Sequence, residues 1–147
     1  MKRVNVYVYT TVKGPRRHSG AYTYVLEVDT SKGPATKSHK ERLENVTEHQ
    51  ADLLSLAAAL KRIYKQCHLV IYTDSVYLAS GIEKWLDGWQ KNDWKSAKGK
   101  EVANAEEWKE LAILLNEHEY ELCVRQKHSY YEWMVSEAEK VTRECMQ

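Results

Sequence analysis

Asp74 stands at a place in the chain where a carboxylate can do chemistry. It follows the unbroken run Leu69–Tyr72 and Thr73, which predicts a strand buried on both faces. Ligands of open α/β sheets bind at the carboxyl ends of strands, and an unpartnered buried carboxylate is costly. Asp74 is therefore a candidate metal or ligand contact, while Ser75 is a good N-cap for the next helix. The alternative for Asp74 is a capping role alone.

Asp52 is a second acid, placed in the first turns of a predicted helix. Thr47 and Gln50 have the spacing of a capping box at the start of this helix. The leucines and alanines that follow have helical spacing, and Asp52 interrupts their apolar face. Two interpretations stay open, an interaction with the helix macrodipole and a functional carboxylate.

Lysines and tryptophans alternate between residues 84 and 100, in a segment too polar for a core. Trp85 and Trp89 are four residues apart, so we expect both to project from one helix face. Phosphates suit lysines, and a sugar or base suits an aromatic ring. The segment predicts a nucleic-acid surface; the alternative is a solvated loop with one anchoring tryptophan. Residues 13–20 form a second basic segment bounded by glycine and proline, which we interpret as a solvated turn.

These residues require a framework that the sequence also predicts. Strands are expected at residues 4–11, 21–28, 35–44, 69–73 and 120–125. Helices are expected from about residues 47 to 63, 75 to 80, 81 to 90, 104 to 116 and 129 to 144. The first three strands have short connections and should form an antiparallel meander. The fourth strand follows a helix, so it should run parallel to an earlier strand with a right-handed crossover.

Composition bounds the class of protein. The 147 residues are 43% hydrophobic and 29% charged, which predicts one globular domain over residues 1–147. The net charge is +1, so a nucleic-acid site must come from local clustering. Cys67, Cys123 and Cys145 lack metal-ligand spacing, and their odd number favours a reducing, cytoplasmic compartment over a disulfide framework. We expect no membrane span and no signal peptide.

The order of elements and several motifs resemble ribonuclease H of the bacterial type with a basic protrusion. The segment Tyr72-Thr73-Asp74-Ser75 resembles the family's strand that ends in T-D-S. The family's basic handle, and the N…W pair beyond it, are matched by Gly81-Ile82, Trp85, Trp89, Trp94-Lys95, Asn104 and Trp108. The resemblance covers nearly the whole chain. It implies an α/β fold, with a five-stranded mixed sheet, three antiparallel N-terminal strands and helices on both faces.

This resemblance implies cleavage of the RNA strand of an RNA/DNA hybrid with two divalent ions, Mg²⁺ or Mn²⁺. Such a site needs converging carboxylates, because one metal activates water and the other stabilises the leaving oxygen. Asp52 and Asp74 match two of the family's acids and are the implied metal ligands. The fourth acid falls nearest Ser136, with Glu137 beside it as the candidate. His128 matches a mobile histidine that helps product release.

The implied acidic set is incomplete. Thr11 stands where the family has an aspartate on the first strand, one residue after Thr10. A neutral hydroxyl cannot balance two divalent charges, so we expect weak or absent metal binding. Asp52 and Asp74 should lie close together near Thr11, and their repulsion should raise the pKa of one carboxyl. Glu48, one turn before Asp52, is a further candidate acid.

The binding groups are kept better than the acids. Thr47 and Asn104 match the family's pocket for a DNA phosphate, and Trp85 matches a ring that lines the DNA channel. Glu48 and His49 replace the amides that contact the minor groove and the 2′-OH, which weakens the case for RNA-specific contact. The residues assigned to nucleic-acid binding are Thr47, Ser75, Trp85, Trp89, Lys91, Trp94, Lys95, Lys98 and Asn104.

Three functions stay open for a chain expected to act as a monomer. The first is a hybrid-cleaving nuclease with an altered metal site. The second is a degenerate ribonuclease H that binds hybrid or duplex without efficient cleavage, and the third is a scaffold that kept only the fold. Family resemblance favours the first, Thr11 and Ser136 favour the second, and the kept handle argues against the third. If Thr11 is the missing ligand, Thr11→Asp should restore some cleavage.

Overall fold

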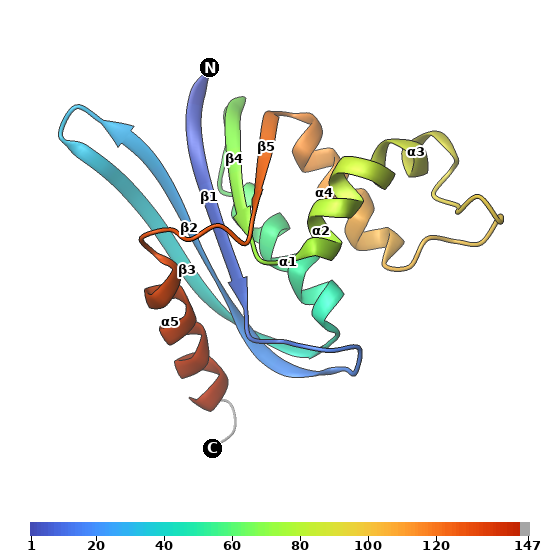
Figure 1. The fold of residues 1–147 in the computed structure, drawn as a ribbon, viewed down its shortest axis with the longest axis horizontal. Helices are drawn as coiled ribbons and strands as arrows, with labels where there is room; N and C mark the ends of the chain where they lie inside the picture. The colour runs from blue at the N-terminus through green and yellow to red at the C-terminus, as the bar shows by residue number, and fades with distance from the viewer. Residues whose placement is uncertain (145–147) are drawn as a thin grey trace.

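A five-stranded mixed sheet forms the centre of the computed structural model, which describes residues 1–144 (Figure 1). Its strands are β1 (Lys2–Thr10), β2 (His18–Thr30), β3 (Gly33–Val46), β4 (Cys67–Thr73) and β5 (Glu119–Val124). They lie in the order β3-β2-β1-β4-β5, with β1–β2 and β2–β3 antiparallel and both β1–β4 and β4–β5 parallel. The predicted sheet, its antiparallel meander and the interior place of β4 are confirmed.

Helices cover both faces of the sheet, as predicted. They are α1 (Glu48–Leu60), α2 (Val76–Ser80), the π-helical turn η1 (Gly81–Trp85), α3 (Leu86–Lys91), α4 (Ala105–Asn116) and α5 (Tyr131–Glu144). Figure 1 shows α5 against one face and α1 against the other, with α4 packed beside α1. None of the helices within residues 1–144 is long and apolar enough to span a membrane. Cys145 lies outside the described residues.

The main core lies between the sheet and the helices α1 and α4. Leu69 and Ile71 of β4 are fully buried there, together with Leu53 and Leu56 of α1. Each such side chain stabilises the fold by roughly 1.5–3 kcal/mol. The nearly continuous burial of β1 from Val4 onward, and of β4, follows from their interior places in the sheet. This packing fixes the ends of β1, β4 and α1 relative to one another, and the functional residues lie at those ends.

Trp108 anchors the segment of residues 81–100, called the handle below, to this core. The indole is fully buried, and its Nε1 donates to the Tyr77 hydroxyl at 2.9 Å. Gly81 lies so close to this ring that an added Cβ would stand 2.3 Å from its Cη2 atom. Only glycine therefore allows the first residue of η1 to pass Trp108.

The π-helical turn overturns the prediction that Trp85 and Trp89 project from one face. Trp85 is 56% exposed. Trp89 instead packs edge-on against Trp108, with ring centroids 5.3 Å apart. A π-turn has i→i+5 hydrogen bonds, so the four-residue spacing no longer places two side chains on one face. Trp89 is thus part of the packing that holds the handle.

Candidate active site

A cleft at the carboxyl ends of β1 and β4 brings the two predicted acids together. Asp74 reaches it from the end of β4, and Asp52 from the first turns of α1. Residues from β1, α1 and the end of β4 line it, namely Val8, Tyr9, Thr10, Lys13, Glu48, Asp52, Ser55, Thr73, Asp74 and Ser75. The predicted capping box is present, because Thr47 accepts from the Gln50 backbone N–H and Gln50 accepts from that of Thr47. It fixes the start of α1 and with it the position of Asp52.

Asp52 is only 8% exposed. Burial raises the pKa of its carboxyl to about 6, while a hydrogen bond from Ser75 opposes that shift. The charges of Glu48 and Asp74 raise the pKa further, and Lys13 lowers it. The expected upward shift of one carboxyl pKa is therefore present, although burial contributes more to it than Asp74 does. Ser75 also caps α2, because its hydroxyl accepts from the Leu78 N–H at 3.0 Å.

Asp74 already has a hydrogen-bond donor from the protein. The Tyr131 hydroxyl donates to Asp74 Oδ2 at 2.7 Å, and this bond raises the pKa of the Tyr131 phenol to about 12. Tyr131 begins α5 and packs edge-on against Tyr9, with ring centroids 5.8 Å apart. One carboxylate oxygen of Asp74 is thus occupied by a neutral phenol.

The residue of β1 beside Asp74 is Tyr9. The parallel register pairs Tyr7 with Tyr72, and two further residues along both strands lead to Tyr9 and Asp74. Burial raises the pKa of Tyr9, and the nearby charges of Glu139 and Asp74 raise it further. The ring is therefore neutral at ordinary pH and carries no charge to balance a metal ion.

Thr11, which the sequence placed at the position of the first acid, lies two residues beyond Tyr9. Its Oγ1 lies 2.8 Å from Thr142 Oγ1 in α5 and accepts from the Ala21 N–H at 3.0 Å. Thr11 is not among the residues that line the cleft. Its hydroxyl joins β1 to α5 and β2, so its observed contacts are structural.

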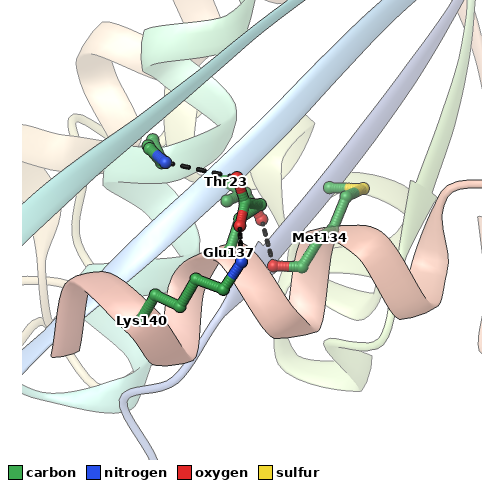
Figure 2. A network of polar contacts seen from close by, with 5 residues as sticks. Thr23, Met134, Glu137 and Lys140 are labelled. Carbon is green, nitrogen blue, oxygen red and sulfur yellow. Dashed lines mark hydrogen bonds and ion pairs between the residues drawn. The ribbon is translucent and has the colours of Figure 1, made fainter. Parts of the chain in front are cut away.

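Glu137 also lies away from the cleft. Its carboxylate pairs with Lys40 of β3 at 3.2 Å and with Lys140 at 3.0 Å, and these two cations lower its pKa. Figure 2 shows it beside Lys140, near the Thr23 hydroxyl that donates to the Met134 carbonyl. The acid of α5 whose charge reaches Tyr9 is Glu139, at the end of the stretch 133–139 in which the resemblance placed the fourth acid, although Glu137 was the candidate chosen.

His128 is packed into an aromatic group close to Asp74. Its ring lies 4.4 Å from that of Tyr7, and its Nδ1 accepts from the Tyr130 N–H at 3.2 Å. Burial lowers its pKa, against the raising effect of Asp74 and Glu27. His128 and Asp74 line the same small cleft. His128 thus lies near Asp74, where its ring packs against the rings of Tyr7 and Tyr130.

A second pocket, of about 320 Å³, brings Thr47 and Asn104 together, as predicted for a phosphate site. It is lined by Gly14, Pro15, Thr47, Glu48, His49 and Asn104. Asn104 is the N-cap of α4 with a left-handed backbone (φ 59°), and its Nδ2 donates to the Tyr77 hydroxyl at 3.4 Å. His49 stacks on Tyr77, with ring centroids 3.6 Å apart. These contacts fix both walls of the pocket.

The handle residues divide into anchors and exposed cations. Trp94 packs against the core with Lys109 Nζ 6.0 Å above its ring, as the anchoring alternative expected. Lys91 pairs with Asp87 at 2.9 Å. Lys95 and Lys98 are exposed and take part in no ion pair within residues 1–144. Of these groups, Lys95 and Lys98 have charges left for a ligand.

Sequence comparison agrees with the fold. Residues 1–130 match the family described as RNase H. A ribonuclease H of Clostridium botulinum (strain Hall) is 32% identical over 149 residues, which is 99% of this chain and 97% of that protein. The chain belongs to the ribonuclease H family. A family member from Francisella tularensis subsp. novicida is 40% identical over 75 residues, covering 51% of this chain and 49% of that one.

Solved structures show the same ribonuclease H fold. LC9-RNase H1, a type 1 RNase H with the type 2 active-site motif, superposes with a TM-score of 0.78 at 20% identity, over 98% of this chain and 74% of that one. LC11-RNase H1 in complex with RNA/DNA hybrid superposes with a TM-score of 0.64 at 15% identity, over 98% and 99%. At these identities the likeness establishes the fold alone.

The ribonuclease H family uses divalent metal ions, and the cleft fits them poorly. Within the described chain, no three His, Cys, Asp or Glu side chains stand close enough together to hold a metal ion. Mg²⁺ prefers an octahedral set of oxygen ligands, usually with carboxylates among them. Here Asp74 has the Tyr9 ring beside it and the Tyr131 hydroxyl on one oxygen, while the Lys13 cation lines the same cleft. The donor set does not suit two divalent ions.

Proposed function

We propose that this ribonuclease H family protein binds RNA/DNA hybrid or duplex nucleic acid and cleaves it weakly or not at all. The observation that carries the proposal is Tyr9 beside Asp74 in a cleft next to the formed Thr47/Asn104 pocket. Two-metal cleavage needs converging carboxylates, and Tyr9 brings a neutral phenol to the cleft beside Asp74. A binding surface needs only the pocket and exposed cations.

The known neighbours support nucleic acid as the ligand. LC11-RNase H1 is solved with RNA/DNA hybrid. The foamy viral protease-reverse transcriptase is solved with double-stranded DNA, and it superposes with a TM-score of 0.68 at 17% identity over 97% of this chain and 92% of that one. In this chain the Thr47 hydroxyl and the Asn104 amide are neutral donors that suit a phosphate, and Lys95 and Lys98 add charge.

A second function, an altered-site nuclease, is favoured by one observation. Glu48, Asp52 and Asp74 still line one cleft. For such a nuclease, the rate of cleavage would be limited by how well the cleft balances the charge of bound metal ions, because the three carboxylates share it with the Lys13 cation and two neutral phenols. Only a direct assay of cleavage separates these two functions.

The test is a labelled RNA/DNA hybrid, incubated with Mg²⁺ or with Mn²⁺. We expect the wild type to bind the hybrid and to cut it slowly or not at all. Tyr9→Asp should gain cleavage because it places a carboxylate beside Asp74. Thr11→Asp is the matched control and should gain none, because Thr11 faces Thr142 outside the cleft. Rapid Mg²⁺-dependent cleavage by the wild type would favour the altered-site nuclease. If the wild type binds no hybrid at any salt concentration, only the scaffold function remains.

A further inference from the structure

The turn between β1 and β2, residues 11–17, carries a local cluster of positive charge. We name it the basic turn. It contains Lys13, Arg16 and Arg17 and no acidic residue. All three cations are exposed, and none forms an ion pair with a carboxylate of residues 1–144. The handle contains both kinds of cation, because Lys91 is paired with Asp87 whereas Lys95 and Lys98 are in no ion pair within residues 1–144.

The basic turn is held firmly against the start of α1. The Gly14 N–H donates to Glu48 Oε1 at 2.9 Å, and the Glu48 N–H donates to the Gly14 carbonyl at 3.2 Å. Arg17 Nη1 donates to the Asn45 carbonyl at 3.1 Å and to Gln50 Oε1 at 2.9 Å. These acceptors are neutral, so they orient the Arg17 guanidinium without cancelling its charge.

His18 closes the base of the basic turn. Its Nε2 lies 2.9 Å from the Lys13 carbonyl and its Nδ1 lies 3.0 Å from the Ser19 carbonyl. A carbonyl oxygen only accepts hydrogen bonds, so both contacts are made together only when both ring nitrogens carry protons. The imidazolium form therefore bridges the two ends of the turn and adds a fourth positive charge.

The basic turn also forms one wall of the Thr47/Asn104 pocket. Gly14 and Pro15 line that pocket opposite the start of α4, which follows the handle in the chain. Figure 1 shows the basic turn and the handle projecting on the same side of the molecule. The pocket thus has the basic turn on one wall and, at Asn104, the start of α4 that follows the handle.

We propose that the basic turn is a second phosphate-binding element, in which Lys13, Arg16 and Arg17 bind the backbone of a nucleic-acid duplex beside the Thr47/Asn104 pocket. The proposal rests on the proposed function, since it assigns this surface to the same ligand. Exposed cations that take part in no ion pair, next to a pocket with neutral donors, suit phosphates that are repeated along a strand.

The basic turn offers contacts to phosphate and none that would distinguish an RNA/DNA hybrid from a DNA duplex. Contacts to phosphate position a duplex but do not distinguish its sugars or bases. Glu48 Oε1 accepts from the Gly14 N–H and the His49 ring is stacked on Tyr77, so the protein already engages the two side chains that stand in place of the amides that contact a 2′-OH in the family. The basic turn should therefore act equally on an RNA/DNA hybrid and on a DNA duplex.

The experiment measures the affinity of a labelled hybrid and of a DNA duplex of the same length over a range of salt concentrations. The variant is Lys13→Gln/Arg16→Gln, which spares Arg17 and its bonds to Asn45 and Gln50. The control is Lys32→Gln/Lys37→Gln. Both cations are exposed, with Lys32 in the turn between β2 and β3 and Lys37 in β3. Figure 1 shows the β2–β3 turn at the opposite end of β2 from the basic turn. Both pairs remove the same charge, and thermal unfolding checks that each variant is folded.

We expect the variant to flatten the slope of log K against log salt by up to ~1.8, about 0.9 for each of the two phosphate-binding cations that it removes. The decrease in affinity should be equal on both ligands, and the control should leave the slope nearly unchanged. If both pairs flatten the slope equally, net charge and not this site is responsible, and the proposal fails. A decrease confined to the hybrid would also overturn it. If the basic-turn variant matches a wild type that binds, only this inference fails; if the wild type binds nothing, the proposed function fails with it.

Discussion

The cleft and the basic turn are neighbours that use their charges in opposite ways. In the cleft, Asp74 accepts from Tyr131, Asp52 accepts from Ser75 and Glu48 accepts from the Gly14 N–H. Each carboxylate is satisfied inside the protein. In the basic turn, Lys13 and Arg16 form no ion pair within residues 1–144, although the Lys13 charge lowers the pKa of Asp52, and Arg17 bonds only to neutral oxygens.

The difference shows which half of a nuclease surface this chain can still use. A charge that the protein already neutralises or bonds has little left for a ligand, whereas an exposed and oriented charge retains its interaction with a phosphate. Family membership alone predicts metal ions in the cleft and modest contacts around it. The observed bonding predicts instead that ligand affinity comes from the surroundings of the cleft.

The largest expected effect concerns the buried acid. Asp52→Asn should raise the free energy of unfolding at pH 7 by about 1–3 kcal/mol, because the wild-type carboxyl has its pKa raised to about 6. The folded state binds this proton more tightly than the unfolded state does. Wild-type stability should therefore fall as pH rises from about 4 to about 6, and this fall should be absent from the variant.

Urea unfolding across that pH range measures this effect. Asp93→Asn, at an exposed handle position, is the matched control and should follow the wild type. If the gain from Asp52→Asn is the same at every pH, the cleft acid is not held in an unfavourable environment, and the contrast with the basic turn disappears.

The second effect concerns the handle. Lys95→Ala/Lys98→Ala should flatten the slope of log K against log salt for hybrid binding by up to ~2. Between low and physiological salt, the variant should therefore lose about tenfold less affinity than the wild type loses. Lys91→Ala should change the slope less, because Asp87 already neutralises Lys91. Equal effects of Lys91 and Lys95 substitutions would show that pairing in the free protein does not decide which cations bind.

Asp74→Asn should leave binding intact or improve it by removing a negative charge.

A smaller effect is expected at the mouth of the cleft. Tyr131→Phe removes the hydrogen bond to Asp74 and should lower the free energy of unfolding by about 0.5–1.5 kcal/mol. Tyr64→Phe, at a side chain that is 86% exposed, should have no measurable effect. An unchanged stability in Tyr131→Phe would mean that the Asp74 carboxylate is available to ligands after all.

The smallest effect belongs to His18. Its contacts with the Lys13 and Ser19 carbonyls raise its pKa above the ordinary value, so its stabilising contribution is present at low pH and is lost as pH rises through the shifted pKa. For so exposed a group we expect only a few tenths of a kcal/mol. A titration of the His18 ring signals by NMR measures the pKa directly, and His18→Gln should remove the pH dependence of hybrid affinity over this range. An unshifted titration would contradict the bridge across the turn.

Hydrophobic patterns predicted the fold because they act through burial. The run at Leu69–Tyr72 and the helical spacing after Thr47 predicted the right elements, and the order of elements predicted the right sheet. Within the site, the resemblance to ribonuclease H implied that Asp52 and Asp74 share one cleft and that Thr47 and Asn104 share one pocket, and each pair does line a common site. These four residues lie at the ends of well-predicted elements, which is why their meeting was predictable.

The errors came from details of register and helix period that a single sequence does not display. Thr11 was chosen from its place after Thr10, whereas the β1–β4 pairing puts Tyr9 beside Asp74. Pairing the two strands from Val6 and Ile71 would have pointed to Tyr9. Trp89 was misplaced because the π-turn departs from the period of 3.6 residues that the prediction assumed.

The close approach of Gly81 to Trp108 has a consequence for how this sequence can vary. Any side chain at position 81 would collide with the indole, so substitution there should be rejected in a library selected for folding. A smaller ring at position 108 would only weaken the packing, which neighbouring side chains can partly refill. Between them, Leu86 is buried and Trp89 and Trp94 pack against the core, whereas the lysines of the handle are exposed. Evolution and protein engineering can thus vary the charge of the handle at its exposed positions, provided that the glycine at its entrance and these anchoring side chains are retained.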